Sequence, residues 1–152
     1  MPVNDEHLFA SFGSLVGQTA RVWRRAADKR LQPFGLTEAT WLPLLWISRA
    51  HKPMLQKDLA AVLSLDNSSV VRLIDNLEAA GLVRRREGED RRAKEILLTD
   101  AGRDVVGNVE RVVNDLRKEI MADLAKQDIE VATKLLDQLS TRLASIAEEN
   151  LT

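Results

Sequence analysis

The chain has 152 residues, of which 45% are hydrophobic and 30% charged, a composition ordinary for one globular domain. Cysteine is absent, which excludes disulfides, thiolate catalysis and cysteine-ligated metal, and suits a reducing cytosol. The net charge is only −1, but residues 100–152 carry seven basic and eleven acidic side chains, which leaves residues 1–99 with a net +3. Such asymmetry is what a local nucleic-acid-binding face would produce.

Apolar residues recur at spacings of three and four from about His7 to Leu31, which predicts a long first helix. Pro33 and Gly35 then end it. No apolar run approaches the roughly eighteen residues of a membrane span, and the N-terminus lacks a secretion-signal pattern. We therefore expect a cytoplasmic protein with no membrane partner.

A second helix is predicted from Thr37, a good N-cap, to about Arg49. Trp46, in the same helix, is expected to belong to the core. Pro43 lies inside this pattern and removes an interior hydrogen bond, so we expect a kink or a broken first turn there.

Two shorter helical patterns follow, over residues 56–63 and from Asp66 or Asn67 to about Ala80. A tight joint separates them, and Gly81 is placed to end the second as a left-handed cap. Two helices joined by a short turn are typical of a helix-turn-helix, whose second helix enters the DNA major groove.

A charged hairpin comes next. Residues 84–94 carry six basic and three acidic side chains, with Gly88 as a turn former between them. Apolar residues flank this stretch on both sides, which predicts two short strands within residues 82–98. A basic hairpin after a helix-turn-helix is a candidate wing, because its positive tip can reach a phosphate-lined groove.

Two further helices are predicted after Thr99. Long helices at both ends of the chain cannot bury their apolar stripes within a domain of this size, and a two-fold dimer is the simplest solution. The stripes of the last two helices are Val105, Val109, Val112, Leu116, Ile120 and Leu124, then Ile129, Ala132, Leu136, Leu139, Leu143 and Ile146.

This order of elements and several segments resemble the MarR family of bacterial winged-helix regulators, and within it the SlyA-like branch, over nearly the whole chain. The segments that carry the resemblance are residues 21–24, 36–41, 69–75, 77–83, 98–99 and above all Asp90-Arg-Arg-Ala-Lys94. The resemblance implies a mainly α fold with a small β wing, in a single domain over residues 1–152. Residues 53–98 would form the winged helix-turn-helix lobe, and residues 1–36 and 105–152 the dimerisation helices.

The family also implies a function. It implies a homodimer bound to double-stranded DNA at a pseudo-palindromic operator, with recognition helices in successive major grooves and wing arginines in the flanking minor groove. It implies a repressor or activator that responds to a ligand, in the bacterial cytoplasm and on the nucleoid when DNA is bound.

The candidate DNA contacts lie in the recognition helix and the wing. Ser68 and Ser69 occupy the first turn of that helix, where N–H groups and hydroxyls suit phosphates or base edges, and where plain N-capping is the alternative. Arg72 can reach a guanine edge or lie solvated at the surface. Arg92 matches the family's Asp-x-Arg pattern and is expected in the minor groove, while Asp90 holds a neighbouring arginine and shapes the tip. The full set is Asn67, Ser68, Ser69, Arg72, Arg84, Arg86, Asp90, Arg91, Arg92 and Lys94.

An effector site is suggested by the SlyA-like branch, in which small aromatic carboxylates bind between the dimer helices and the DNA-binding lobe. Trp23 and Trp41, with Arg21 and Thr37, offer an aromatic wall and a cation suited to such a ligand. The alternative is that both tryptophans are core anchors.

Two other function classes remain to be weighed. An enzyme is disfavoured, because the chain has no glycine-rich phosphate loop, no cysteine or tyrosine, and only two histidines. We expect no cofactor and no metal. The second serious hypothesis is a winged-helix module that binds another protein instead of DNA, and the arginine-rich wing counts against it.

Overall fold

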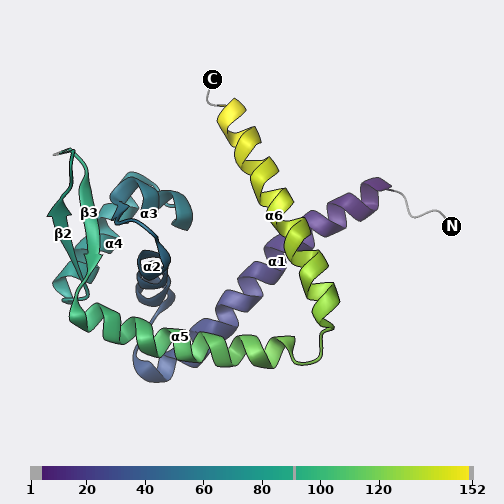
Figure 1. Cartoon of the computed structure of the whole chain (residues 1–152), viewed down its shortest axis with the longest axis horizontal. Helices are drawn as coiled ribbons and strands as arrows, with labels where there is room; N and C mark the ends of the chain where they lie inside the picture. Colours follow the sequence, from purple (N-terminus) through teal and green to yellow (C-terminus); the bar gives the residue numbers. More distant parts are fainter. Residues whose placement is uncertain (1–4, 91, 151–152) are drawn as a thin grey trace. The chain divides into compact units, whose positions relative to one another are not determined.

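Helices form most of the chain in the computed structural model, which describes residues 5–90 and 92–150 (Figure 1). The mainly α fold with a small β wing is therefore confirmed. The chain divides into two compact units, Met1–Asn114 and Asp115–Thr152, and α5 belongs to both. The elements in chain order are α1 (Asp5–Leu31), η1 (Gln32–Phe34), α2 (Glu38–Arg49), β1 (Met54–Leu55), α3 (Gln56–Leu63), α4 (Asn67–Ala79), β2 (Val83–Glu87), β3 (Lys94–Leu98), α5 (Asp100–Met121) and α6 (Lys126–Glu149).

The helix-turn-helix forms where the sequence predicts it. α3 has the predicted bounds, and the joint to α4 is made by Ser64, whose φ of 54° is left-handed. Gly81 ends α4 with a φ of 75°, a conformation that glycine adopts without steric cost. Left-handed residues thus end both helices, Ser64 after α3 and Gly81 after α4.

α2 follows its predicted N-cap, Thr37. It begins at Glu38 and continues through Pro43, so its first turn is not broken. The Pro43 ring is fully buried, and this packing offsets the lost hydrogen bond. Trp46 is 42% exposed, so its assignment to the core is wrong. At about 100° per residue, Trp46 lies roughly 200° around the helix from the fully buried Leu44.

The core of the lobe lies between α2, α3, α4, the sheet and the start of α5. The sheet is antiparallel in the order β1-β3-β2, so the short strand β1 adds a third strand to the predicted hairpin. β2 and β3 pair over their whole lengths, from Val83 opposite Leu98 to Glu87 opposite Lys94. The core side chains are Leu44, Ile47, Met54, Leu59, Val70, Ile74, Leu77, Val83, Ile96 and Val106.

The base of the hairpin is closed onto the start of α5. The Thr99 hydroxyl donates to the carbonyl of Gly81 at 2.6 Å and accepts from the N–H of Gly102 at 3.0 Å. The Thr99 N–H donates to the carbonyl of Leu82 at 3.1 Å. A Cβ on Gly102 would collide with that carbonyl oxygen, so only glycine allows this approach.

The buried face of α5 in the first unit differs from the predicted stripe. Val106, Val109 and Val113 are buried, whereas Val105 and Val112 are only half-buried. The sequence places valines side by side at 105–106 and at 112–113, and both choices fit a spacing of three and four. Periodicity alone cannot choose between them.

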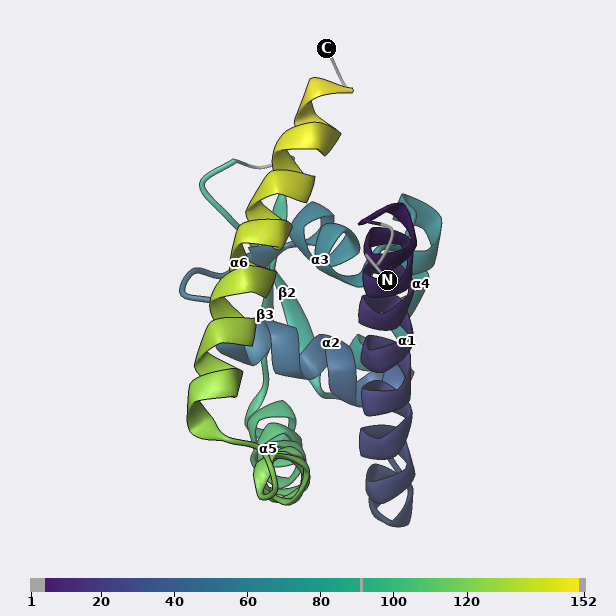
Figure 2. The same cartoon turned by 90° about the vertical axis from the view of Figure 1, so that its right-hand side faces the viewer.

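The long terminal helices leave much apolar surface uncovered. In α1, which Figure 2 shows as one long helix, Leu8, Phe9 and Leu15 are at least half exposed. In α6 no described residue is buried, and Leu136 and Leu143 are 44% and 56% exposed. Apolar stripes of this extent are typical of an interface with another molecule.

We predict that Gly102→Ala lowers the free energy of unfolding by about 1–3 kcal/mol, because the added methyl group forces α5 away from the hairpin base. The matched control is Gly107→Ala in the same helix, where a Cβ meets no atom within 4 Å. There the substitution should stabilise the protein by about 0.5–1 kcal/mol through helix propensity. Urea denaturation of both variants measures the difference, and equal effects would contradict the close approach.

Candidate nucleic-acid interface

The first turn of α4 is capped by Asp66, whose Oδ1 accepts a 2.7 Å hydrogen bond from the backbone N–H of Ser69. This bond and one from the Ser69 side chain hold the pKa of Asp66 below its usual range, so the cap is lost only as the pH falls through that lowered pKa. The N-cap is therefore Asp66, and neither predicted serine takes that place. Ser68 and Arg72 are exposed on the same helix.

A cleft of about 390 Å³ lies between the first turn of α2 and α4, and we call it the α2–α4 cleft. Its polar groups include the guanidinium of Arg72 and the hydroxyls of Thr37 and Thr40, whose oxygens are 3.4 Å apart. A cation beside several hydroxyls suits an anion such as a phosphate. The lining residues are Thr37, Ala39, Thr40, Ser69, Arg72, Leu73, Asn76, Leu77, Ala80 and Leu82.

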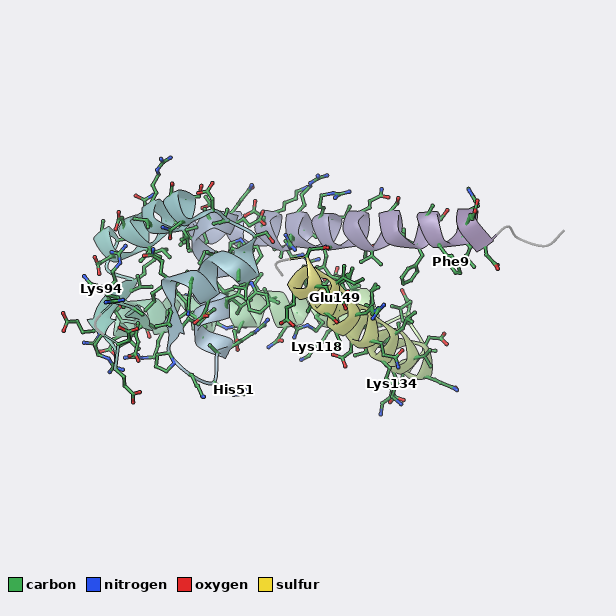
Figure 3. The ribbon with its side chains drawn as sticks, turned by 90° about the horizontal axis from the view of Figure 1, so that it is seen from above. Phe9, His51, Lys94, Lys118, Lys134 and Glu149 are labelled. Carbon is green, nitrogen blue, oxygen red and sulfur yellow. The ribbon has the colours of Figure 1, made fainter. Side chains whose placement is uncertain are left out.

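A second cleft, of about 310 Å³, lies between the wing and the first turns of α3 and α4, and we call it the wing cleft. Three exposed or half-exposed cations line it, Lys57, Arg92 and Lys94, and none of its described lining residues is acidic. Figure 3 shows Lys94 at the wing end of the first unit. Asn67 also lines this cleft and accepts a 3.1 Å bond from the side-chain amide of Gln56.

The three consecutive arginines of β2 have different surroundings. Arg84 is exposed. Arg85 is only 17% exposed and forms ion pairs with Asp75 and Glu78 of α4. Arg86 bonds through Nε and Nη2 to Oε2 of Glu95 on β3, at 3.1 and 2.6 Å, and its side chain stays 53% exposed. Alternation along the strand explains why Arg85 alone turns inward toward α4.

The tip of the wing is shaped by Asp90. Its Oδ1 accepts a 3.0 Å bond from the backbone N–H of Arg92, and its carbonyl accepts one of 3.0 Å from Ala93. Asp90 therefore contacts the backbone of a neighbouring arginine, Arg92, at the turn of the hairpin. Arg91, which was also predicted to contact DNA, lies outside the described residues.

These elements have counterparts in known proteins. A family model described as the MarR family matches residues 34–93, from the end of η1 to the tip of the wing. The solved structure of transcriptional regulator PA3341 is 33% identical, with a TM-score of 0.82, over 88% of this chain and 98% of that chain. This chain belongs to the MarR family. It is accordingly a DNA-binding transcriptional regulator with a winged helix-turn-helix, and not an enzyme.

Two further MarR-family structures are similar. CouR from Rhodococcus jostii RHA1, solved with p-coumaroyl-CoA bound, is 26% identical with a TM-score of 0.73, over 84% of this chain and 90% of that chain. MepR from S. aureus, solved as a complex with DNA, is 22% identical with a TM-score of 0.72, over 87% of this chain and 97% of that chain. The second of these supports the fold alone.

The predicted effector residues are not gathered around the α2–α4 cleft of this MarR-family chain. Thr37 lines that cleft, whereas Arg21, Trp23 and Trp41 do not. Trp41 is 3% exposed, and its indole N–H donates to Oδ1 of Asp28 on α1 at 3.1 Å. Trp41 therefore anchors α2 to α1 within the core. On α1, Trp23 is half-buried and Arg21 is exposed.

Sequence reasoning missed two residues of the interface. Thr40 is one turn beyond Thr37 in α2, and Lys57 lies in the first turn of α3. A basic residue at the start of the first helix of a helix-turn-helix was a signal that could have found Lys57. Among residues 5–90 and 92–150, no group of three or more potential ligands could hold a metal ion, and no helix is long and apolar enough to cross a membrane.

Proposed function

We propose that this MarR-family protein binds a pseudo-palindromic operator as a homodimer, with α4 in the major groove and the wing in the flanking minor groove. The observation that carries the proposal is the grouping of exposed cations and hydroxyls in two clefts on either side of the α4 N-terminus. MepR, which has the same fold, was solved as a complex with DNA.

The α4 residues have distinct proposed roles. Arg72 reads a guanine edge with its guanidinium, and Ser68 contacts a base edge or a phosphate. Thr37 and Thr40 bind a backbone phosphate in the α2–α4 cleft, which moves Thr37 from the effector site to the DNA interface. Ser69, whose N–H and hydroxyl bond to Asp66, contributes by holding the first turn of α4 in place.

The wing residues act mainly through charge. Arg92 enters the minor groove, where the negative potential is concentrated, and its place in the wing cleft beside Lys57 and Lys94 supports this role. Arg84 and Arg86 contact phosphates, Asn67 orients the first turn of α4, and Asp90 shapes the tip. Arg91 is proposed as a DNA contact from the sequence alone.

The dimer is proposed to be held by the terminal helices, residues 1–36 and 105–152, around the winged lobe of residues 53–98. Support comes from the uncovered apolar side chains of α1 and α6. Figure 3 shows the ring of Phe9, which is 69% exposed, projecting from α1. A second copy of the chain is the simplest cover for such stripes, because a two-fold interface buries the same surface on both subunits.

A small aromatic or phenolic acid is proposed as the effector, as the resemblance to the SlyA-like branch implies. CouR, a structure similar to this chain, was solved with p-coumaroyl-CoA bound, which supports a ligand site in a relative. Arg21 would pair with the carboxylate and Trp23 would stack on the ring. Trp41 would sense the ligand from the core through its bond to Asp28.

The DNA-binding proposal is tested by anisotropy of a labelled duplex from the protein's own upstream region, across a salt series. Arg92→Ala should weaken binding by a few kcal/mol and make the slope of log K against log salt shallower by about two units, one for each subunit. Arg72→Ala should in addition relax base preference at one position in each half-site, with half-site centres about 10 bp apart.

The controls for this series are chosen by position. Lys57→Ala should reduce the slope as Arg92→Ala does, whereas Lys29→Ala, an exposed lysine at the end of α1, should leave it unchanged. If Arg92→Ala bound with wild-type affinity and slope, the wing would be structural only. A winged-helix module that binds another protein would then be the better description.

The dimer is tested by Leu136→Asp, which should cost at least about 3 kcal/mol by burying an unpaired charge, and should abolish dimer and DNA binding together. Sedimentation velocity measures the first effect and duplex anisotropy the second. Gln138→Asp is the matched control, since it adds the same charge at an exposed position roughly 200° around α6. A Leu136→Asp protein that remains dimeric would place the interface elsewhere.

The effector is tested by titrating salicylate into the operator complex at millimolar concentrations. We expect weaker DNA binding and a change in tryptophan fluorescence, because the ligand favours a lobe arrangement that no longer fits the duplex. Arg21→Ala should remove both responses. Unchanged fluorescence together with unchanged operator affinity would exclude this class of ligand.

A further inference from the structure

Arg85 ties the wing to the recognition helix, and we call its contacts with Asp75 and Glu78 the Arg85 bridge. Nη2 of Arg85 donates to Oδ1 of Asp75 at 2.6 Å, and Nη1 donates to Oε1 of Glu78 at 3.0 Å. The backbone N–H of Arg85 donates to the other carboxylate oxygen of Glu78 at 3.1 Å. One residue of β2 is thus bonded three times to two consecutive turns of α4.

The arginine of the bridge is shielded from solvent, although Asp75 and Glu78 remain 59% and 43% exposed. The side chain of Arg85 is 17% exposed, whereas its neighbour Arg86 is 53% exposed. Charge-assisted bonds from a planar guanidinium to two carboxylates fix both distance and direction. Arg85 therefore cannot turn toward a duplex without breaking all of its side-chain bonds.

The carboxylates themselves need an explanation. Asp75 and Glu78 place two negative charges on the helix that is proposed to enter the major groove, where phosphates repel them. Arg85 neutralises only one of these charges. Because Asp75 and Glu78 by themselves lower the affinity for DNA, their benefit must come from the contact that they make with Arg85.

The Arg85 bridge holds the hairpin at a fixed direction relative to α4. The base of the hairpin is closed by Thr99 on Gly81, and Arg85 fixes the centre of β2, opposite Ile96. A five-residue strand spans about 16 Å, so a tilt of roughly 10° about the base would move the tip by about 3 Å. That displacement is enough to take a side chain at the tip out of contact with a groove.

We propose that Arg85 is a positioning residue for DNA recognition, so that Asp75 and Glu78 set how much Arg92 contributes to binding although neither touches the duplex. The inference rests on the proposed role of Arg92 in the minor groove. Arg92 belongs to a different element from the two carboxylates, and any energetic coupling between them must pass through the angle of the wing.

A double-mutant cycle on the full-length protein tests the inference. Arg92→Ala is measured in the wild-type background and in the Asp75→Asn/Glu78→Gln background, on the same operator duplex and at one salt concentration. In the wild-type background it should cost about tenfold or more in affinity. In the bridge-free background it should cost less than about threefold, because Arg92 no longer reaches its groove.

Footprinting distinguishes a change in the direction of the wing from a general loss of folding stability. The bridge-free variant should keep its protection of guanine N7 in the major groove and lose hydroxyl-radical protection over the flanking minor groove. Glu38→Gln/Asp104→Asn makes the same charge change at exposed positions of α2 and α5 and should leave both footprints unchanged. A general loss of folding would reduce both footprints equally.

The outcomes are distinguishable. If Arg92→Ala costs the same factor in both backgrounds, the Arg85 bridge does not position the wing and the inference is overturned. If Arg92→Ala costs nothing even in the wild-type background, the proposed role of the wing fails first, and the inference with it. Should thermal denaturation show that the double variant is unfolded, Arg85→Lys repeats the cycle, since lysine keeps the charge and cannot bridge both carboxylates.

Discussion

The close approach of the hairpin base to the start of α5 is the constraint on which the rest of the lobe depends. Gly102 has no side chain, Thr99 donates to Gly81, and the carbonyl of Leu82 fills the space between them. The end of the recognition helix, the root of the wing and the first turn of a long helix therefore meet within a few residues. A change in the position of any one of these three elements therefore alters the positions of the other two.

The basic residues of the wing differ in whether their side chains form ion pairs within the lobe or remain exposed. Arg85 is used internally, and Arg86 is steadied by Glu95. The backbone of Arg92 is held by a carboxylate two residues earlier, and its side chain remains exposed. A count of arginines in the hairpin overstates the charge that a duplex would meet, and the paired carboxylates explain the difference.

Much of the fold could be predicted from the sequence, because the signals that begin and end the helices lie in a few adjacent residues. Gly81 and the joint after Leu63 define the helix-turn-helix, and the run of charges at 84–94 defines the hairpin. What failed depended on packing between elements. The adjacent valines at 105–106 left two possible buried faces for α5. Trp46 was assigned to the core because it is hydrophobic, although its position around the helix turns it outward.

For the site, residue types indicated α4 and the wing, but only the folded lobe groups Thr37 with Arg72 and Lys57 with Lys94.

The bonds made by α4 have a consequence for how such a regulator could acquire new target genes. Its cap uses Asp66, and its tie to the wing uses Asp75 and Glu78. Ser68 contributes to the cap through its backbone, which a change of its side chain retains, and Arg72 contributes only through its charge. With the proposed roles of Ser68 and Arg72 in base recognition, substitutions at these two exposed positions would change the preferred base sequence and keep the bonds that hold α4. Evolution can thus vary what the helix reads without altering where the hairpin lies, which allows descendants of one gene to diverge in operator and still fold alike.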